Sequence, residues 1–378
     1  MAKKRQFDYS LFIIVFGLLA FGLMMIYSTS AYEAGRLFDG DAAHFFRSQL
    51  GATLGGLAAM LFVSIFPPYK FYRSIPWWLP LIVAVGAVLM LLTPWKVTAN
   101  GATRWFKIFG IGPSIQSAEI VKLMMIIYGA KVVADYPKMM QTWKGFFWLV
   151  IPSGVLGVLI WQISNNLSSA LIVVGIGILM IFIASPQYKK YIVAAALAIA
   201  AVIILVMIFD QPADMEGMEF RGKRIAAWLH PELYPSETAY QTLQALYAIG
   251  SGGLTGKGIG ESIQKMGFIP EAQNDMIFAI ICEELGLMGA ALVLILFLVL
   301  IYRLIYIAMH AKDLHGAMLT VGVLAHISIQ VILNIAVVTN TIPNTGISLP
   351  FISYGGSAAF FTLIEIGLVL NVAREADL

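Results

Sequence analysis

The stretch Asp275 to Tyr302, DMIFAIICEELGLMGAALVLILFLVLIY, decides the fold class of this 378-residue chain. From Leu285 onward it carries no charged residue, and as a helix it is long enough to cross the roughly 30 Å hydrocarbon core of a bilayer. Its first part nevertheless holds Asp275, Glu283 and Glu284, which are costly in lipid and must face protein or water. The stretch predicts a membrane-spanning helix with a polar beginning.

Other apolar runs of similar length predict further spans, and together they define an all-α, polytopic membrane protein with ten transmembrane helices. The predicted spans are 8–30, 46–66, 77–94, 115–134, 145–162, 166–184, 189–209, 275–302, 314–339 and 352–373. Because 60% of the residues are apolar and only 12% are charged, against about a quarter in soluble proteins, a soluble globule and a disordered chain are excluded. A formal charge of +3 gives no reason to expect a nucleic-acid partner. We predict one integral membrane domain over residues 1–378.

Lys and Arg are unevenly distributed over the predicted loops. The loops on the side of the two termini hold many more of them than the short loops opposite. The positive-inside rule therefore predicts that both termini are cytoplasmic.

The connection 210–274, between the seventh and eighth spans, is far longer than the others and is predicted to be a large extracellular loop of the same domain. Residues 239–248 form the pattern of a short amphipathic helix, and residues 249–260, IGSGGLTGKGIG, predict a glycine-rich turn that brings backbone close to another group. Arg221 and Arg224 supply cations in this loop, although such residues can also simply contact lipid headgroups.

Asp275 follows this loop at the beginning of the eighth span. Pro270 interrupts the chain, and Asn274 is predicted to cap a helix whose first turn carries Asp275. The helix dipole favours the ionised carboxyl, so we expect Asp275 to be charged at neutral pH and able to accept a proton from a substrate outside the membrane. The alternative is that Asp275 only caps the helix.

Two further groups of polar residues lie in or beside predicted spans. Glu119 and Lys122 are three residues apart, which permits an ion pair that is either structural or part of a polar cavity. Ser353, Gly355 and Gly356 precede the last span and predict irregular backbone that lines a cavity.

Taken together, four blocks of sequence resemble one family of polytopic peptidoglycan glycosyltransferases, the shape, elongation, division and sporulation (SEDS) family of FtsW, RodA and SpoVE. The blocks are NGATRWF (100–106) with QSAEIVK (116–122), YQTLQALYAIGSGGLTGKGIG (240–260), FIPEAQNDMIFAIICEELG (268–286) and GISLPFISYGGS (346–357). The segments ESIQK (261–265) and LPFISYGGS (349–357) resemble the division branch, FtsW, more closely than the elongation branch.

The resemblance implies a substrate and partners. The substrate would be lipid II, a disaccharide-pentapeptide on undecaprenyl pyrophosphate, polymerised into glycan strands at the outer face of the bacterial cytoplasmic membrane for cell division or cell-shape maintenance. A class B penicillin-binding protein, a transpeptidase, and the division or elongation machinery would be the partners.

In such a transfer the leaving pyrophosphate is acidic enough to depart without a proton, so one base suffices, in contrast to glycosidases. We therefore predict Asp275 as the catalytic residue, acting as general base or as transition-state acceptor. Arg104, Lys107, Arg221 and Arg224 are the candidate pyrophosphate contacts.

Three further points complete the site prediction. Arg104 and Lys107 have an alternative role as interfacial anchors. Glu119, Lys122, Ser353, Gly355 and Gly356 complete the predicted substrate-binding set. A divalent cation, Mg²⁺ or Mn²⁺, is a possible cofactor, although no acidic cluster has the spacing of a dedicated metal site.

Two rival functions are also compatible with this sequence. A lipid II flippase or transporter would also use ten spans and intramembrane charge, but it would favour charges near the midplane, whereas the densest polar cluster here lies on one face. A membrane scaffold would show no turnover.

Overall fold

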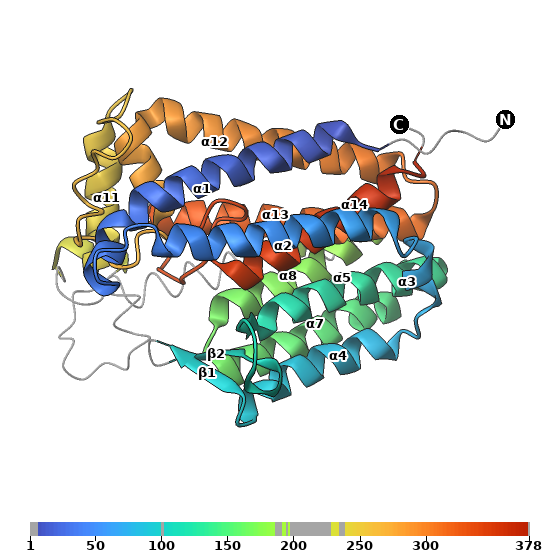
Figure 1. Cartoon of the computed structure of the whole chain (residues 1–378). Helices are drawn as coiled ribbons and strands as arrows, with labels where there is room; N and C mark the ends of the chain where they lie inside the picture. The colour runs from blue at the N-terminus through green and yellow to red at the C-terminus, as the bar shows by residue number, and fades with distance from the viewer. Residues whose placement is uncertain are drawn as a thin grey trace.

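The computed structural model describes residues 7–99, 102–185, 191–193, 196, 228–233 and 239–376, and these are mostly helical (Figure 1). The helices are α1 (Tyr9–Leu37), α2 (His44–Ile65), α3 (Lys70–Ser74), α4 (Trp78–Leu89), α5 (Ser117–Asp135), α6 (Pro137–Met140), α7 (Trp143–Ser164), α8 (Leu167–Ala184), α11 (Tyr240–Gly252), α12 (Ile277–Met309), α13 (Leu314–Val338) and α14 (Gly356–Ala373). Short 3₁₀ turns are η1 (Met90–Leu92), η2 (Ile108–Gly110) and η4 (Pro231–Leu233).

Seven of the described helices, α1, α2, α7, α8, α12, α13 and α14, are long and apolar enough to cross a membrane. The chain is therefore a multi-pass membrane protein. The predicted spans 77–94 and 115–134 correspond to the shorter apolar helix Trp78–Leu92 and to α5, which carries several charged residues. Only residues 191–193 and 196 of the predicted span 189–209 are described. The described residues also leave out 210–227 and 234–238 of the predicted loop. The count of ten spans thus stays a prediction.

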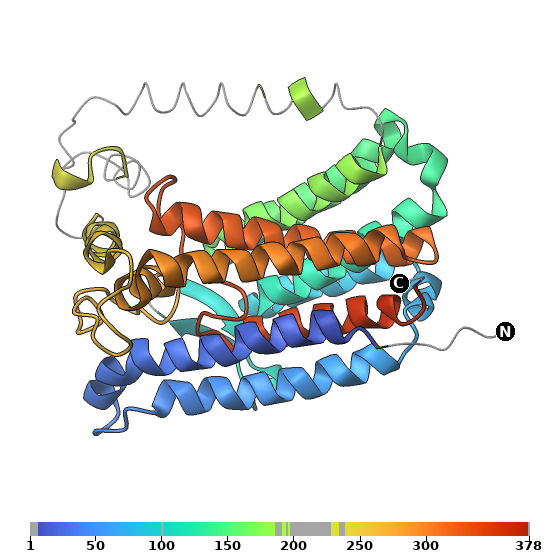
Figure 2. The ribbon, with the colours of Figure 1, turned by 90° about the horizontal axis from the view of Figure 1, so that it is seen from above.

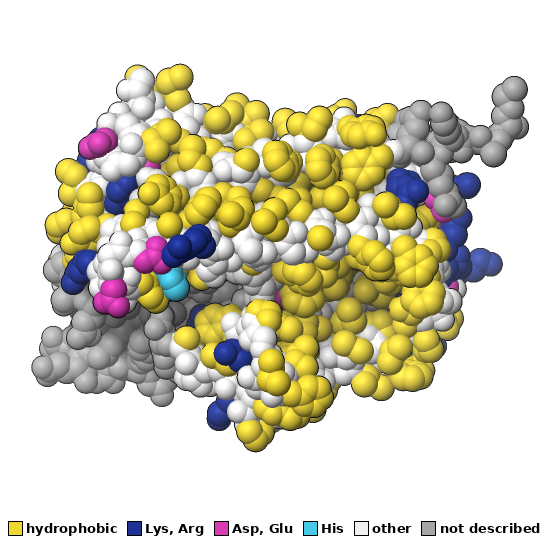
Figure 3. All heavy atoms as spheres, in the orientation of Figure 1, with side chains coloured by type: hydrophobic (Ala, Val, Ile, Leu, Met, Phe, Trp, Pro, Cys, Tyr) yellow, Lys and Arg dark blue, Asp and Glu magenta, His cyan; other side chains and the backbone are white. Residues whose placement is uncertain are grey.

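The bundle has two distinct ends. The beginning of α1, the end of α14 and α3 lie at one end, which we call the terminal end, whereas α11, the strands and the connection into α12 lie at the opposite, loop end (Figure 1). In the view turned by 90°, α1 and α2 run side by side along the bundle, as do α12 and α13 (Figure 2). Hydrophobic side chains cover the long side of the bundle that is seen in Figure 3.

Helix α12 shows how an apolar helix serves both core and lipid. Val293, Phe297 and Leu300 are buried in the bundle, while Leu292 and Leu298 on other faces of the same helix are exposed. Because lipid is as apolar as the core, both faces tolerate large hydrophobic side chains, which explains why the sequence shows a continuous apolar run.

A small antiparallel sheet at the loop end corrects the all-α prediction. Strands β1 (Lys96–Ala99), β2 (Ala102–Phe106) and β3 (Ile115–Gln116) pair in that order, with Val97 opposite Trp105 and Trp105 opposite Gln116. The signal was present in the sequence, because an Asn-Gly dipeptide at 100–101 stands between two short β-compatible runs. Strands β1 and β2 lie outside the predicted apolar runs, and β3 is only the first two residues of the run 115–134, so hydropathy alone did not reveal the sheet.

Candidate active site at the loop end of the bundle

Asp275 lies in the turn that leads into α12, and not in the first helical turn as predicted. The helix begins at Ile277 with Met276 as N-cap, and the Asn274 side-chain amide donates to Glu271 Oε2 (2.6 Å). The predicted Asn274 cap is therefore wrong. The physical reason is that the residues before Ile277 form successive turns, with Glu271 in a left-handed conformation (φ 49°), so Asn274 is used inside the turn.

The backbone of Asp275 is held by α13 and by residues 341–355, the pre-α14 segment. Asn334 Nδ2 donates to the carbonyl of Asp275 (2.8 Å) and to the carbonyl of Ile347 (2.6 Å). Next to this contact, the amide of Tyr354 donates to the carbonyl of Gln273 (2.9 Å). Asn334 is fully buried, so its amide fixes two carbonyls that the surrounding apolar core could not satisfy.

The carboxyl group of Asp275 has an unusual acidity. Burial raises the pKa of Asp275 to about 6, and the negative charge of Glu271 also raises it, whereas the positive charge of Arg104 lowers it. The lowered pKa expected from a place in the first helical turn is therefore not found, because Asp275 precedes the helix and burial raises its pKa. The group is still mainly ionised at neutral pH, as predicted, and its pKa lies close to the value at which a general base is most effective.

The positive charge of Arg104, in the small sheet, lies near enough to lower the pKa of this carboxyl, although the two residues are far apart in the sequence. Arg104 belongs to β2, and the next strand, β3, is tied to the beginning of α14 because the amide of Gln116 donates to Ser357 Oγ (3.3 Å). The structure therefore brings together two of the residues that we predicted as catalytic base and phosphate contact. Lys107 follows β2 and its amide donates to Trp95 O (3.0 Å); among the described contacts, none joins its side chain to Asp275.

The pre-α14 segment is irregular, as the sequence predicted. Ser353 Oγ accepts from the amide of Leu349 (2.8 Å), Phe351 has φ 65°, and the amide of Gly355 donates to Gln49 Oε1 (3.0 Å). These contacts use Ser353 and Gly355 to shape the backbone beside Asp275, and Gly356 begins α14. Their role in substrate binding stays a prediction.

Glu119 and Lys122 form the predicted ion pair, with Lys122 Nζ 2.8 Å from Glu119 Oε1 and both side chains buried. The pair belongs to a network inside the bundle that the sequence did not reveal. Lys122 Nζ lies 2.8 Å from His326 Nε2, and His326 Nδ1 lies 2.6 Å from Glu365 Oε2. The network joins α5, α13 and α14 in the interior of the bundle.

Helix α13 connects this network to Asp275 through polar side chains at intervals of four residues. Gln330 Oε1 accepts from Lys122 Nζ (3.2 Å), and Gln330 Nε2 donates to the carbonyl of Ser348 in the pre-α14 segment (2.9 Å). His326, Gln330 and Asn334 thus lie on one face of the helix. The signal that could have found them is this four-residue spacing of polar residues within an apolar run.

The other predicted cations have different outcomes. Arg221 and Arg224 lie outside the described residues. Two further cations of the loop 210–274, Lys257 and Lys265, pair with Glu283 and Glu284. For a metal, Asp275 and Glu271 offer two carboxylates, and the described ranges contain no group of three or more His, Cys, Asp or Glu that could hold an ion. A Mg²⁺ or Mn²⁺ ion would fit here only with substrate phosphates and water as further ligands, which is common for Mg²⁺.

The fold and this geometry define a multi-pass membrane protein with a candidate acid–base site at one end of its bundle. A family model described as "Cell cycle protein", that of FtsW, RodA and SpoVE, matches residues 9–378. Stage V sporulation protein E of Bacillus subtilis is 38% identical over 373 residues, which are 98% of each chain. A probable peptidoglycan glycosyltransferase FtsW of Geobacter metallireducens is 33% identical over 383 residues, which cover 99% of this chain and 96% of that protein.

A solved structure has the same fold. It is a chain of a peptidoglycan synthase complex that coordinates polymerization and crosslinking, with a TM-score of 0.76, 22% sequence identity and coverage of 98% of both chains. The chain belongs to the FtsW/RodA/SpoVE family. The family membership expected from the four sequence blocks is confirmed.

Proposed function

We propose that this protein is a peptidoglycan glycosyltransferase that polymerises lipid II into glycan strands. The observation that carries the proposal is the Asp275 carboxyl, which has a pKa of about 6 and interacts with Arg104. Support from relatives comes from the FtsW proteins of Geobacter metallireducens and Trichlorobacter lovleyi, which are named probable peptidoglycan glycosyltransferases. The division branch stays a prediction, because one of the similar relatives is a sporulation protein.

The chemistry needs one base and one region of positive charge. The 4-hydroxyl of the acceptor sugar attacks the anomeric carbon of the donor, and its proton passes to the ionised Asp275 carboxyl. The new glycosidic bond forms as the bond from the anomeric carbon to the pyrophosphate oxygen breaks, and the electron pair leaves with the pyrophosphate. Arg104, with Lys107, Arg221 and Arg224 as further candidates, stabilises the developing phosphate charge. A divalent cation at the site would add to this stabilisation.

The membrane arrangement follows from the same proposal. We place ten spans in the bacterial cytoplasmic membrane with both termini in the cytoplasm and the loop end, including the large loop 210–274, outside. Exposed Glu261 and Lys312 lie in connections at opposite ends of α12. A single cysteine introduced at Glu261 should react with a membrane-impermeant maleimide on intact cells, and one at Lys312 should not. The reverse pattern would contradict the arrangement.

A class B penicillin-binding protein, a transpeptidase, is the proposed partner, together with the division or elongation machinery. Glycan strands need crosslinking, and the similar solved chain is part of a peptidoglycan synthase complex. Copurification with a tagged transpeptidase of the same cell tests this part of the proposal.

The decisive experiment is lipid II polymerisation by purified protein. Asp275→Ala should abolish glycan formation while the protein remains folded, whereas Glu261→Gln, which neutralises an exposed acid of the same loop, should keep the parent rate. Equal rates for Asp275→Ala and the parent would refute the assignment of the base.

The rival function, a lipid II flippase, is favoured by one observation, the buried network of Glu119, Lys122, His326 and Glu365 within the bundle. Its charged groups are mostly satisfied by one another, which suits a structural role. Translocation of fluorescent lipid II in proteoliposomes without glycan formation would favour the flippase.

A further inference from the structure

Helix α12 is interrupted near the loop end, and a turn of the preceding loop replaces its missing hydrogen bonds. Gly286 has φ 65° and ψ −165°, which breaks the helix between residues 277–285 and the long remainder. The amides of Lys257 and Gly258 donate to the carbonyls of Glu283 and Glu284 (both 2.9 Å). In the other direction, the amides of residues 287 and 288 donate to the carbonyls of residues 253 and 254 (2.9 and 3.1 Å).

The close approach of these two backbones depends on glycine. A Cβ at Gly252 would lie 1.9 Å from the carbonyl oxygen of Cys282, and one at Gly256 would lie 2.1 Å from that of Glu284. Gly286 is equally restricted, because its Cβ would lie 2.3 Å from the amide nitrogen of Gly256. The predicted glycine-rich turn thus does bring backbone close to another group, and that group is the break in α12.

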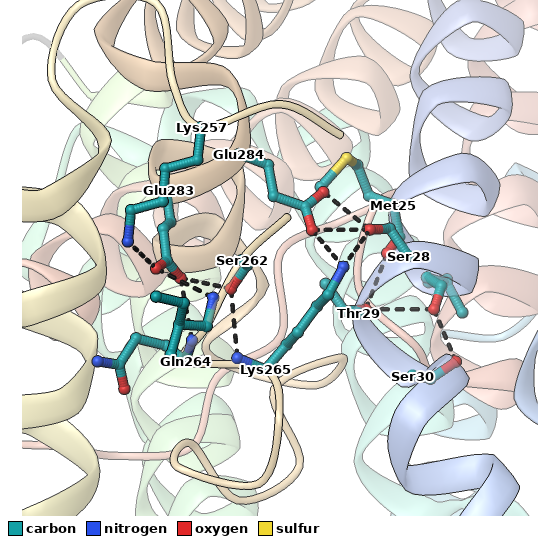
Figure 4. Close-up of polar contacts among 12 residues, drawn as sticks. Met25, Ser28, Thr29, Ser30, Lys257, Ser262, Gln264, Lys265, Glu283 and Glu284 are labelled. Atoms are coloured by element: carbon teal, nitrogen blue, oxygen red, sulfur yellow. Dashed lines mark hydrogen bonds and ion pairs between the residues drawn. The ribbon is translucent and has the colours of Figure 1, made fainter. Parts of the chain in front are cut away.

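The two carboxylates at the break fasten the same loop through side chains (Figure 4). Glu283 pairs with Lys257 Nζ (2.6 Å) and accepts from the amides of residues 263 and 264 and from the Ser262 hydroxyl. Glu284 pairs with Lys265 Nζ (2.6 Å). Both carboxylates are fully buried, so each is compensated by a cation as buried charges require.

The Glu284 pair also reaches across to α1. Ser28 Oγ donates to the Glu284 carboxylate (2.8 Å) and accepts from Lys265 Nζ (3.0 Å), as the side chains drawn in Figure 4 show. Nearer to Asp275, Gln273 Nε2 donates to Glu33 Oε2 of α1 (2.9 Å). The chain from Lys265 to Glu284, which contains Asp275, is therefore tied to α1 close to both of its ends.

We infer that Glu284, with Lys265 and Ser28, is a positioning residue that holds the broken segment 277–285 and so places Asp275 against its substrate. The inference rests on the proposed glycosyltransferase function. Asp275 lies two residues before this segment, so a shift of the segment relative to α1 moves the carboxyl relative to Arg104. Glu284 itself lies more than two helical turns from Asp275 and acts through the backbone.

The test compares ion pairs at the two ends of the same helix contact. Glu284→Gln removes the carboxylate at the loop end, and Asp8→Asn removes the carboxylate that pairs with Arg303 Nη2 (2.8 Å) at the terminal end of α1 and α12. We expect Glu284→Gln to lower kcat of lipid II polymerisation about tenfold to a hundredfold with KM within about twofold, because small misplacements of a catalytic group cost this much. Asp8→Asn should keep the parent kcat per folded molecule.

A milder variant keeps the test decisive where Glu284→Gln does not fold. Ser28→Ala removes only the bridging hydroxyl and should lower kcat in the same direction, by about threefold or more, at unchanged KM. Charge reversal of the pair, Lys265→Glu with Glu284→Lys, should recover part of the kcat that Lys265→Glu alone loses.

The possible failures are distinguishable. If the parent protein forms no glycan, the proposed function fails. If the parent forms glycan and the folded Glu284→Gln or Ser28→Ala protein has the parent kcat, the positioning role fails while the function stands. Equal loss of kcat in Asp8→Asn would likewise overturn the positioning role, because it would show a general effect of weakening the contact between α1 and α12.

Discussion

The acidity of Asp275 predicts the pH dependence of the enzyme. With a pKa of about 6, raised by burial, about 90% of the carboxyl is ionised at pH 7 and about 10% at pH 5. If the ionised form is the general base, kcat/KM should fall about tenfold between these pH values and about tenfold for each further unit.

Two neighbouring charges should move this midpoint in opposite directions. Arg104 lowers the pKa of Asp275, so Arg104→Gln should move the midpoint of the fall in kcat/KM at acidic pH, here called the acidic limb, to higher pH. Glu271 raises the pKa, so Glu271→Gln should shift the limb to lower pH. The assay is the initial rate of lipid II polymerisation in detergent between pH 4.5 and 8, with each protein checked for retained folding at every pH value.

The opposite signs make the reasoning refutable. A general effect of mutation would change the rate without moving the midpoint, or would move it in one direction for both variants. Either result, or an acidic limb with a midpoint near 4 in the parent, would show that the Asp275 carboxyl is not the group that controls the rate.

Three further predictions concern stability, each measured by thermal unfolding in detergent. Because the pKa of Asp275 is raised from its ordinary value of 3.8 to about 6 in the folded state, stability falls as the pH rises through this range, and the loss is complete above pH 6. Asp275→Asn should therefore stabilise the protein at pH 7 by about 1 to 2 kcal/mol, after allowance for partial solvent exposure, and not at pH 4. Glu119→Gln leaves the Lys122 ammonium buried without its carboxylate and should cost about 3 to 5 kcal/mol; a loss below about 1 kcal/mol would contradict a charged pair. Gly286→Ala should destabilise by more than about 2 kcal/mol, since its φ is positive and its Cβ meets backbone, while Gly17→Ala, which has open space in α1, should be neutral or slightly stabilising.

The seven long apolar helices among the described residues could be predicted from the sequence, because an apolar run is a local property. An apolar run such as 314–339 must form a helix in lipid, where every backbone group needs a partner within the segment, and the structure has α13 at Leu314–Val338. The ion pair of Glu119 and Lys122 was readable for the same reason, because residues three apart in a helix are neighbours whatever surrounds them.

Features that depend on partners distant in the sequence could not be read in this way. The break at Gly286 is stable only because residues 253–258 supply the missing hydrogen bonds. The sequence suggested that Asn274 caps a helix, but the turn before Ile277 uses it otherwise.

The candidate site likewise contains one residue that the sequence indicated and several interactions that depend on distant segments. Asp275 could be singled out because a carboxyl beside an apolar run is unusual, and the family resemblance strengthened that choice. Its pKa, its approach to Arg104 and its attachment to Asn334 could not be predicted, because desolvation and electrostatic interaction depend on distances in space between segments far apart along the chain. Local hydrophobicity is therefore enough to predict the seven long apolar helices among the described residues, whereas the chemistry of the site arises from the packing of α12, α13 and the small sheet around one carboxyl group.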